Sequence, residues 1–276
     1  MGIEYAHNQL QPLETLLLPR LPAHAKLLDL CCGTGHLTQR LLQNGYCVTG
    51  LDGSEAMLNY AHQNAPTANF VLGDARSFAL PDRVHGVYCM SASLNHIMSL
   101  SDLQAVFTCV YAILEDNGWF LFDLNHPAQM QKWWIGQIVE GEIRPRFAWY
   151  LTPLYSATTD TGYFQITLFQ APVQAPASPR SSLWQGLKQG IYSALTLPWL
   201  TRLRLKVLAQ FDAWQPDWQR STLRYDVRGY PESDVRAALQ AAGFSEIQVS
   251  TLDGSTPVDA NHSAYFLCRK SVGGTE

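Results

Sequence analysis

The stretch LLDLCCGTGHLTQRLL, residues 27–42, decides how this sequence is interpreted. An apolar run leads through Asp29 to two cysteines, a Gly-Thr-Gly turn follows, and a pattern typical of a helix begins at His36. A strand that meets a helix through glycines directs backbone N–H groups into the crevice above a parallel sheet, where open α/β folds bind ligands. The stretch therefore predicts the first strand, turn and helix of a ligand-binding sheet.

Strand-like and helix-like segments alternate on both sides of a less regular middle section. Strands are expected at 26–30, 46–51, 70–72, 86–90 and 119–124, with helices at 36–43, 54–64 and 103–114. The alternation returns with a helix that starts at Pro231 and with strands at 247–251 and 263–268. This order predicts an α/β fold with a Rossmann-like sheet covered by helices on both faces.

The middle section breaks this pattern. Antiparallel strands are expected at 146–150, 163–169 and 221–227, and a Pro/Ala/Ser linker leads into apolar residues at helical spacing. The sequence therefore predicts one domain from 1–125 and 229–276, with an antiparallel-β and helical insertion at 126–228. The insertion is interpreted as a cap, a substrate-binding element or a homodimer contact. Its basic, amphipathic part, 182–210, could instead make a peripheral membrane contact.

Composition and charge argue against several classes of partner, location and metal site. The 276 residues are 47% apolar and only 15% charged, and the net charge of −4 argues against a nucleic-acid partner. The N-terminus has no signal-peptide core and no run of about 18 apolar residues occurs, so a cytoplasmic location is expected. The six cysteines form no CxxC pair and no zinc-like spacing, which predicts free thiols and no metal site.

Acidic residues at the strand ends indicate the ligand. A dinucleotide fold would favour glycine or alanine at Thr38, and no Gly-Lys-Ser/Thr of a P-loop follows. Asp52 ends the second strand, where it could accept hydrogen bonds from ribose hydroxyls or cap the next helix. Asp74 could bind an adenine amino group, and Asp29 a cationic amino group. Three carboxylates suit S-adenosylmethionine better than a pyrophosphate, because like charges repel.

Four segments carry a resemblance to a known family. LLDLCCGTGHLT, VTGLDGSEAMLNYA, FVLGDARSF and LQAAGFSEIQV are similar to successive motifs of class I S-adenosylmethionine-dependent methyltransferases, over about 25–125 and 230–270. The resemblance implies that Met57 packs against the adenine. The expected cofactor-binding residues are Tyr5, Asp29, Cys31, Gly33, Gly35, Asp52, Gly53, Met57, Asp74, Ala75, Arg76 and Ser91.

The segment from Met90 to Pro127 resembles a small-molecule subgroup that includes sugar N,N-dimethyltransferases and uncharacterised bacterial methyltransferases. The resemblance implies an antiparallel sheet inserted after strand five, which caps the active site and often mediates dimers. The Ser-Ala-Ser-Leu at 91–94 differs from the Asn/Asp-Pro-Pro-aromatic motif of DNA N-methyltransferases. We therefore expect N- or O-methylation of a small molecule, with a lipid- or quinone-directed membrane-surface enzyme or a non-catalytic scaffold as alternatives.

Methyl transfer from a sulfonium is an in-line displacement in which positioning can supply most of the rate. Asn95 could orient the acceptor or the methionine part of the cofactor, and His96 could take a proton or merely cap a helix. His126 follows strand five and is expected to face the same crevice. Tyr5 and His7 could close the cofactor site, whereas a structural role is expected for His262.

Overall fold

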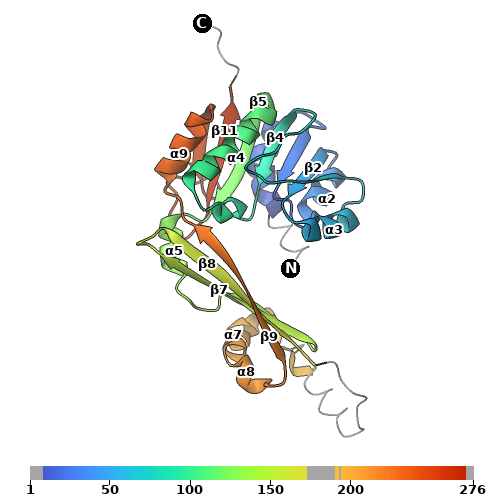
Figure 1. Ribbon diagram of the computed structural model, residues 1–276, viewed down its shortest axis with the longest axis vertical. Coiled ribbons are helices and arrows are strands. Elements are labelled where there is room, and N and C mark those ends of the chain that lie inside the picture. The colour runs from blue at the N-terminus through green and yellow to red at the C-terminus, as the bar shows by residue number, and fades with distance from the viewer. Residues whose placement is uncertain (1–8, 173–189, 193, 272–276) are drawn as a thin grey trace. The chain divides into compact units, whose positions relative to one another are not determined.

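The computed structural model describes residues 9–172, 190–192 and 194–271. The chain divides into two compact units, which Figure 1 draws as ribbons. Unit 1 runs up to Met130 and resumes at Arg228, and unit 2 spans Gln131–Val227. The functional division expected at 125/126 and 228/229 remains a prediction. The residues expected to close the site, Tyr5 and His7, lie outside the described residues, as does the expected helical segment over 183–189.

Unit 1 contains a seven-stranded sheet with the order β10-β11-β5-β4-β1-β2-β3. Its strands are β1 (Lys26–Leu30), β2 (Cys47–Asp52), β3 (Asn69–Leu72), β4 (Val84–Cys89), β5 (Leu114–Leu124), β10 (Phe244–Ser250) and β11 (Ala264–Lys270). Strands β1 to β5 pair in parallel, so that their carboxyl ends meet at one edge of the sheet. The predicted Rossmann-like α/β sheet is confirmed.

The last two strands complete a mixed sheet. β11 runs antiparallel to β5, with Ala264 opposite Leu124, and β10 runs antiparallel to β11. No helix connects β10 to β11, and a direct connection of this kind reverses the strand direction. The loop 251–263 therefore returns to the carboxyl edge of the parallel strands.

Helices cover the sheet because its strands are apolar on both faces. The helices of unit 1 include α2 (His36–Gln43), α3 (Glu55–Asn64), α4 (Leu100–Ile113) and α9 (Glu232–Ala241), while α5 (Pro127–Trp133) begins in unit 1 and ends in unit 2. Leu27 packs on one face with Leu41 of α2, while Leu28 packs on the other face in the cluster that contains Phe107 of α4. α4 and α9 lie side by side on this second face (Figure 1).

Helix caps explain where two of these helices begin. The Ser54 hydroxyl accepts a hydrogen bond from the Met57 N–H at 3.3 Å, which confirms the predicted N-cap of α3. α4 begins at Leu100, earlier than predicted, because Ser99 caps it by accepting from the Asp102 N–H. Pro231 was expected to be the first helical residue of α9 and is instead its N-cap, in an extended conformation.

Unit 2 contains a four-stranded sheet with the order β6-β7-β8-β9. The strands are β6 (Glu140–Ile143), β7 (Phe147–Ser156), β8 (Thr161–Gln170) and β9 (Gln219–Arg228), accompanied by α7 (Thr201–Ala209) and α8 (Phe211–Trp214). β6, β7 and β8 pair antiparallel, as expected for the insertion. Ala148 and Phe169 pack against Leu208 and Phe211 in a core that lies within unit 2.

Candidate functional site

The glycine turn between β1 and α2 depends on two residues with left-handed backbones. Gly33 has φ +54° and Gly35 has φ +73°, which a residue with a side chain adopts only with strain. A Cβ on Gly35 would lie 3.0 Å from the Cβ of Ala61 and 3.1 Å from the Phe70 ring, whereas one on Gly33 would meet no atom of the described residues within 4 Å. Gly35 therefore allows α3 to pack closely, and Gly33 leaves open space at the turn.

Asp29 lies beneath this turn and is only 3% exposed. Its carboxyl group accepts a hydrogen bond from the Thr38 hydroxyl at 2.6 Å. Burial raises the pKa of Asp29 from 3.8 to about 7, although the nearby Thr38 and Tyr88 hydroxyls act to lower it. The Tyr88 hydroxyl is buried and has no hydrogen-bond partner of good geometry among the described residues.

Asp52, at the end of β2, connects the turn to the next helix. One carboxylate oxygen accepts from the Gly33 N–H at 2.8 Å, and the other accepts from the Ser54 N–H at 2.9 Å. A carboxylate has about four lone-pair positions, so these two bonds leave acceptor capacity at the rim of the turn.

A cavity of about 240 Å³ opens beside the glycine turn, at the carboxyl edge of the parallel strands. Its walls are Asp29, residues 31–34, His36 and Leu37 of α2, Gln9, and Met90, Ser91 and Ser93 after β4. The structure thus brings together four residues expected from the sequence: Asp29, Cys31, Gly33 and Ser91.

The wall after β4 is a strained turn. Ser91 has φ +71° and Ala92 has φ +53°, both in the left-handed region that residues other than glycine rarely adopt. Both carboxylate oxygens of Asp123, on β5, lie 3.0 Å from the Ala92 N–H, which donates to them. Asp123 is 5% exposed, and burial raises its pKa to about 6 against the lowering effect of the surrounding backbone N–H groups.

Five further residues that were expected to bind the cofactor, with Met57 and Asp74 expected at its adenine, lie outside this cavity. Arg76 forms an ion pair with Asp74 at 2.5 Å, and this contact lowers the pKa of Asp74 to about 2. Ala75 is buried in the core, and Met57, in the first turn of α3, is 43% exposed. Gly53 follows Asp52 directly. The adenine-binding role of Met57 and Asp74 remains a prediction, as does the cofactor-binding role of the other three residues.

Asn95 fastens the end of β4 to other parts of unit 1. Its amide donates to the carbonyl oxygens of Asn125 at 3.0 Å and Arg228 at 2.7 Å, and it accepts from the Asn125 N–H at 2.9 Å. The side chain is 1% exposed and does not line the cavity. The neighbouring His96 is exposed at the end of a short 3₁₀ helix, Ser93–His96.

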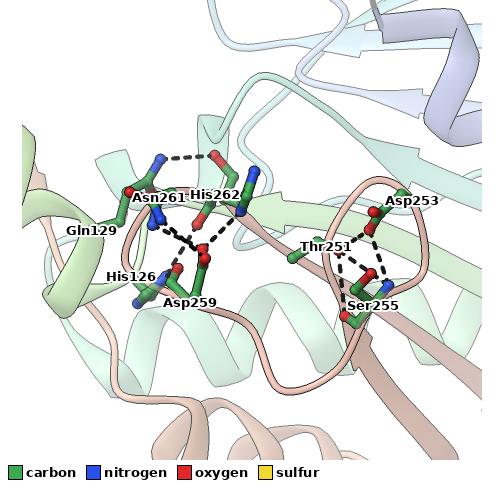
Figure 2. A network of polar contacts seen from close by, with 9 residues as sticks. His126, Gln129, Thr251, Asp253, Ser255, Asp259, Asn261 and His262 are labelled. Carbon is green, nitrogen blue, oxygen red and sulfur yellow. Dashed lines mark hydrogen bonds and ion pairs between the residues drawn. The ribbon is translucent and has the colours of Figure 1, made fainter.

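His126, expected to face the crevice, contacts the loop between β10 and β11. Its Nε2 lies 3.1 Å from the carbonyl oxygens of both Asp259 and His262 (Figure 2). His262 in turn pairs with the Asp259 carboxylate at 2.7 Å. This geometry gives His126 an anchoring contact, and its catalytic role remains a prediction.

Comparison with known proteins places the chain in a family. Residues 27–118 match the family described as "Methyltransferase domain". An uncharacterised methyltransferase from Synechocystis sp. is 35% identical over 166 residues, which cover 59% of this chain and 76% of that protein. The chain belongs to the methyltransferase family. The predicted enzyme class, an S-adenosylmethionine-dependent methyltransferase, is thereby confirmed, with S-adenosylmethionine as its cofactor.

Two further comparisons concern the acceptor and the fold of this methyltransferase. The dTDP-3-amino-3,6-dideoxy-alpha-D-glucopyranose N,N-dimethyltransferase of Streptomyces fradiae is 36% identical over 104 residues, which cover 38% of this chain and 40% of that enzyme. An S-adenosylmethionine-dependent methyltransferase from Clostridium acetobutylicum superposes with a TM-score of 0.68 at 16% identity, covering 99% of this chain and 93% of the other. The methyltransferase spans about three quarters of its Synechocystis relative but less than half of its sugar-modifying relative.

The residues around the methyltransferase cavity fit the polar part of its cofactor. Gln9 lines the cavity, and its Oε1 atom is buried without a hydrogen-bond partner among the described residues. Asp29 adds a carboxyl group that a cationic amino group would hold in its charged form. Within the described ranges, no group of three or more His, Cys, Asp or Glu is placed to hold a metal ion. No helix in this part of the chain has the length and apolar character needed to cross a membrane.

Several residues of the site were missed by sequence reasoning. Thr38 was noted only as a break in a dinucleotide motif, yet its hydroxyl bonds to Asp29. Its position one helical turn after Gly35 is the signal that could have identified it. Gln9, Tyr88 and Asp123 carry no such signal, because they reach the site from other elements through tertiary packing.

Proposed function

We propose that this methyltransferase acts on a small-molecule acceptor at nitrogen or oxygen, with a nucleotide-linked amino sugar as the leading acceptor class. The observation that supports this proposal is the cavity beside the glycine turn. It is lined by the buried carboxyl group of Asp29 and by Gln9, whose amide oxygen has no partner among the described residues. The acceptor class is supported by three relatives that are named as N,N-dimethyltransferases of dTDP-linked amino sugars.

The cofactor supplies a methyl group already activated on a sulfonium, so the task of the chain is to bind and to position. In this proposal Asp29 provides the counter-charge for the amino group, and Gln9 Oε1 provides a second acceptor. Asp52, which already accepts from Gly33 and Ser54, uses its remaining lone pairs for the ribose hydroxyls. The adenine is assigned to Gly53, Met57, Asp74, Ala75 and Arg76, with Tyr5 as a further contact.

The acceptor side is assigned to the residues after β4 and β5. His96 is exposed and is the candidate to take a proton from an acceptor that arrives protonated. Asn95 and His126 contribute by holding the ends of β4 and β5 in place, since their polar atoms are engaged with backbone groups.

Other expectations remain proposals about the whole protein. These are a cytoplasmic location, the absence of a nucleic-acid partner, a homodimer contact and a peripheral membrane contact through 182–210. The two alternative functions, a lipid- or quinone-directed enzyme and a non-catalytic scaffold, gain no support from the relatives found.

The test has two stages. Calorimetry with S-adenosylmethionine and S-adenosylhomocysteine should give heat of binding for the wild-type chain and weaker binding for Asp52→Asn. The matched control is Asp82→Asn, an exposed carboxylate that pairs with Lys26, the first residue of β1. Turnover is then measured as S-adenosylhomocysteine release with dTDP-3-amino-3,6-dideoxyglucose, with glycine, and with a malonyl thioester. Absence of binding by a folded wild-type chain would exclude the proposal, and binding without turnover on this panel would favour the scaffold.

A further inference from the structure

The cavity wall after β4 is held in place by a carboxylate that does not itself line the cavity. Asp123 lies on β5, yet both of its oxygens lie 3.0 Å from the Ala92 N–H. Met90, Ser91 and Ser93, on both sides of Ala92, line the cavity. Asp123 therefore reaches the cavity through the backbone of this turn.

The turn needs such a partner because its conformation is unfavourable. Ser91 and Ala92 are consecutive residues with positive φ, a conformation that is unfavourable for any residue with a Cβ. Cys31, on the opposite wall of the cavity, also has a positive φ of 62°. Strained backbones outside glycine persist only where the surroundings enforce them, and they concentrate at functional sites.

Burial makes the Asp123 contact both strong and specific. The side chain is 5% exposed, so its charge is poorly solvated and is stabilised by the N–H groups that point to it. A neutral amide at the same position would present one acceptor and one donor to these N–H groups. The side-chain NH2 group would face backbone N–H groups that are also donors, and the turn would lose a hydrogen bond that holds its conformation.

We propose that Asp123 is a positioning residue for cofactor binding, which fixes the Ser91–Ala92 turn in the left-handed conformation that completes the cavity wall. The proposal rests on the proposed function, since it assigns the cavity to the cofactor. The proposal states that the cofactor site requires the backbone conformation at 91–92 and does not require the charge of Asp123 itself.

Glycine at position 92 separates these two roles. Glycine adopts positive φ without strain, so Ala92→Gly removes the strain at one of the two turn residues without restoring a buried charge. The turn of this variant should therefore depend less on Asp123. Calorimetric titration with S-adenosylhomocysteine compares the wild type, Asp123→Asn, Ala92→Gly and the double variant. Asp116→Asn, an exposed carboxylate at the other end of β5, is the matched control.

We expect Asp123→Asn to bind about tenfold more weakly than the wild type, and Asp116→Asn to bind like the wild type. Ala92→Gly alone is the reference against which the double variant is compared. The double variant should recover much of the loss. Wild-type affinity in Asp123→Asn, or a double variant no better than Asp123→Asn, would overturn the proposal. A wild-type chain that does not bind at all would refute the proposed function and this proposal with it.

A second variant covers the case in which Asp123→Asn does not fold. Ala92→Val leaves Asp123 intact and places a β-branched residue where positive φ is most unfavourable. Its affinity for S-adenosylhomocysteine should fall about tenfold while circular dichroism stays that of the wild type. Unchanged affinity in this variant would equally refute the assigned role.

Discussion

At the scale of single residues, Gly33 and Gly35 share one turn but require glycine for different reasons. Alanine at Gly33 costs only the left-handed backbone, about 1–2 kcal/mol, because a Cβ there meets open space. Alanine at Gly35 adds overpacking against Ala61 and Phe70, about 1–3 kcal/mol more. Chemical denaturation should therefore show a larger loss of unfolding free energy for Gly35→Ala than for Gly33→Ala. Equal losses would contradict the packing role of Gly35.

Asp29 provides a prediction about pH. Its pKa is about 7 in the folded chain against 3.8 in the reference state. At a pH between these two values, the Asp29 carboxyl group is therefore protonated in the folded chain and ionised in the unfolded chain. The stability that Asp29 contributes is therefore fully present below about pH 4 and is lost as the pH rises through about 7. The loss is on the order of 2–4 kcal/mol. Asp29→Asn should flatten this part of the stability–pH profile measured by urea denaturation.

The matched control for this experiment is Asp74→Asn. The pKa of Asp74 is lowered to about 2 by Arg76, so any stability it contributes is present above about pH 4 and is lost as the pH falls towards 2. The two carboxyl groups thus act in separate pH windows. If Asp29→Asn leaves the pH dependence of the unfolding free energy between pH 4 and 7 unchanged, the Asp29 carboxyl group does not take up a proton on folding in this range.

At the scale of secondary-structure elements, sequence reasoning succeeded where a local signal existed. The run around Lys26–Leu30, the helix His36–Gln43 and the Ser54 cap are determined by apolar periodicity and capping chemistry within a few residues. β6 was missed because its four residues, Glu-Gly-Glu-Ile, have almost no strand character, and pairing with β7 alone makes them a strand.

The same limit applies to the candidate site. The carboxylates at strand ends could be found from their spacing, because parallel strands bring these positions to one edge. The partners that decide how those groups behave come from elsewhere in the chain. Tyr88 meets Asp29 through the β1–β4 pairing, and Asp123 meets Ala92 across β4 and β5. Burial and backbone strain at these positions depend on tertiary packing, which the local sequence pattern does not indicate.

β6 also carries a prediction of its own. A Cβ on Gly141 would lie 2.5 Å from Leu208 Cδ1 and 2.6 Å from the Trp149 carbonyl oxygen. Gly141→Ala should therefore destabilise unit 2 by about 1–3 kcal/mol, since neither the backbone oxygen nor the packed leucine can move freely. Gly190→Ala is the control, because a Cβ there meets no atom of the described part of the chain within 4 Å. If thermal denaturation shows the same change in stability for Gly141→Ala and Gly190→Ala, the close packing around Gly141 is contradicted.

At the scale of the whole molecule, the two units each bury an apolar core of their own. The sheet of unit 1 is packed on both faces, with Phe107 in one core cluster and Tyr88 in the other. In unit 2, Ala148 and Phe169 pack with Leu208. Separate cores can unfold in separate cooperative steps, and a destabilising substitution then lowers only the step of the unit that contains it.

Ligand binding should identify these steps, because every residue that lines the cavity belongs to unit 1. In the proposed function S-adenosylhomocysteine binds the folded cavity and not the unfolded chain, so a concentration of 100 times Kd should stabilise unit 1 by about 2.7 kcal/mol. Differential scanning calorimetry should show this ligand raising one transition, while Gly141→Ala lowers the other. Gly35→Ala should lower the transition that the ligand raises. If the ligand and Gly141→Ala both moved the same single transition, the units would share one cooperative core, and the stability of the insertion would then be coupled directly to occupation of the cofactor site.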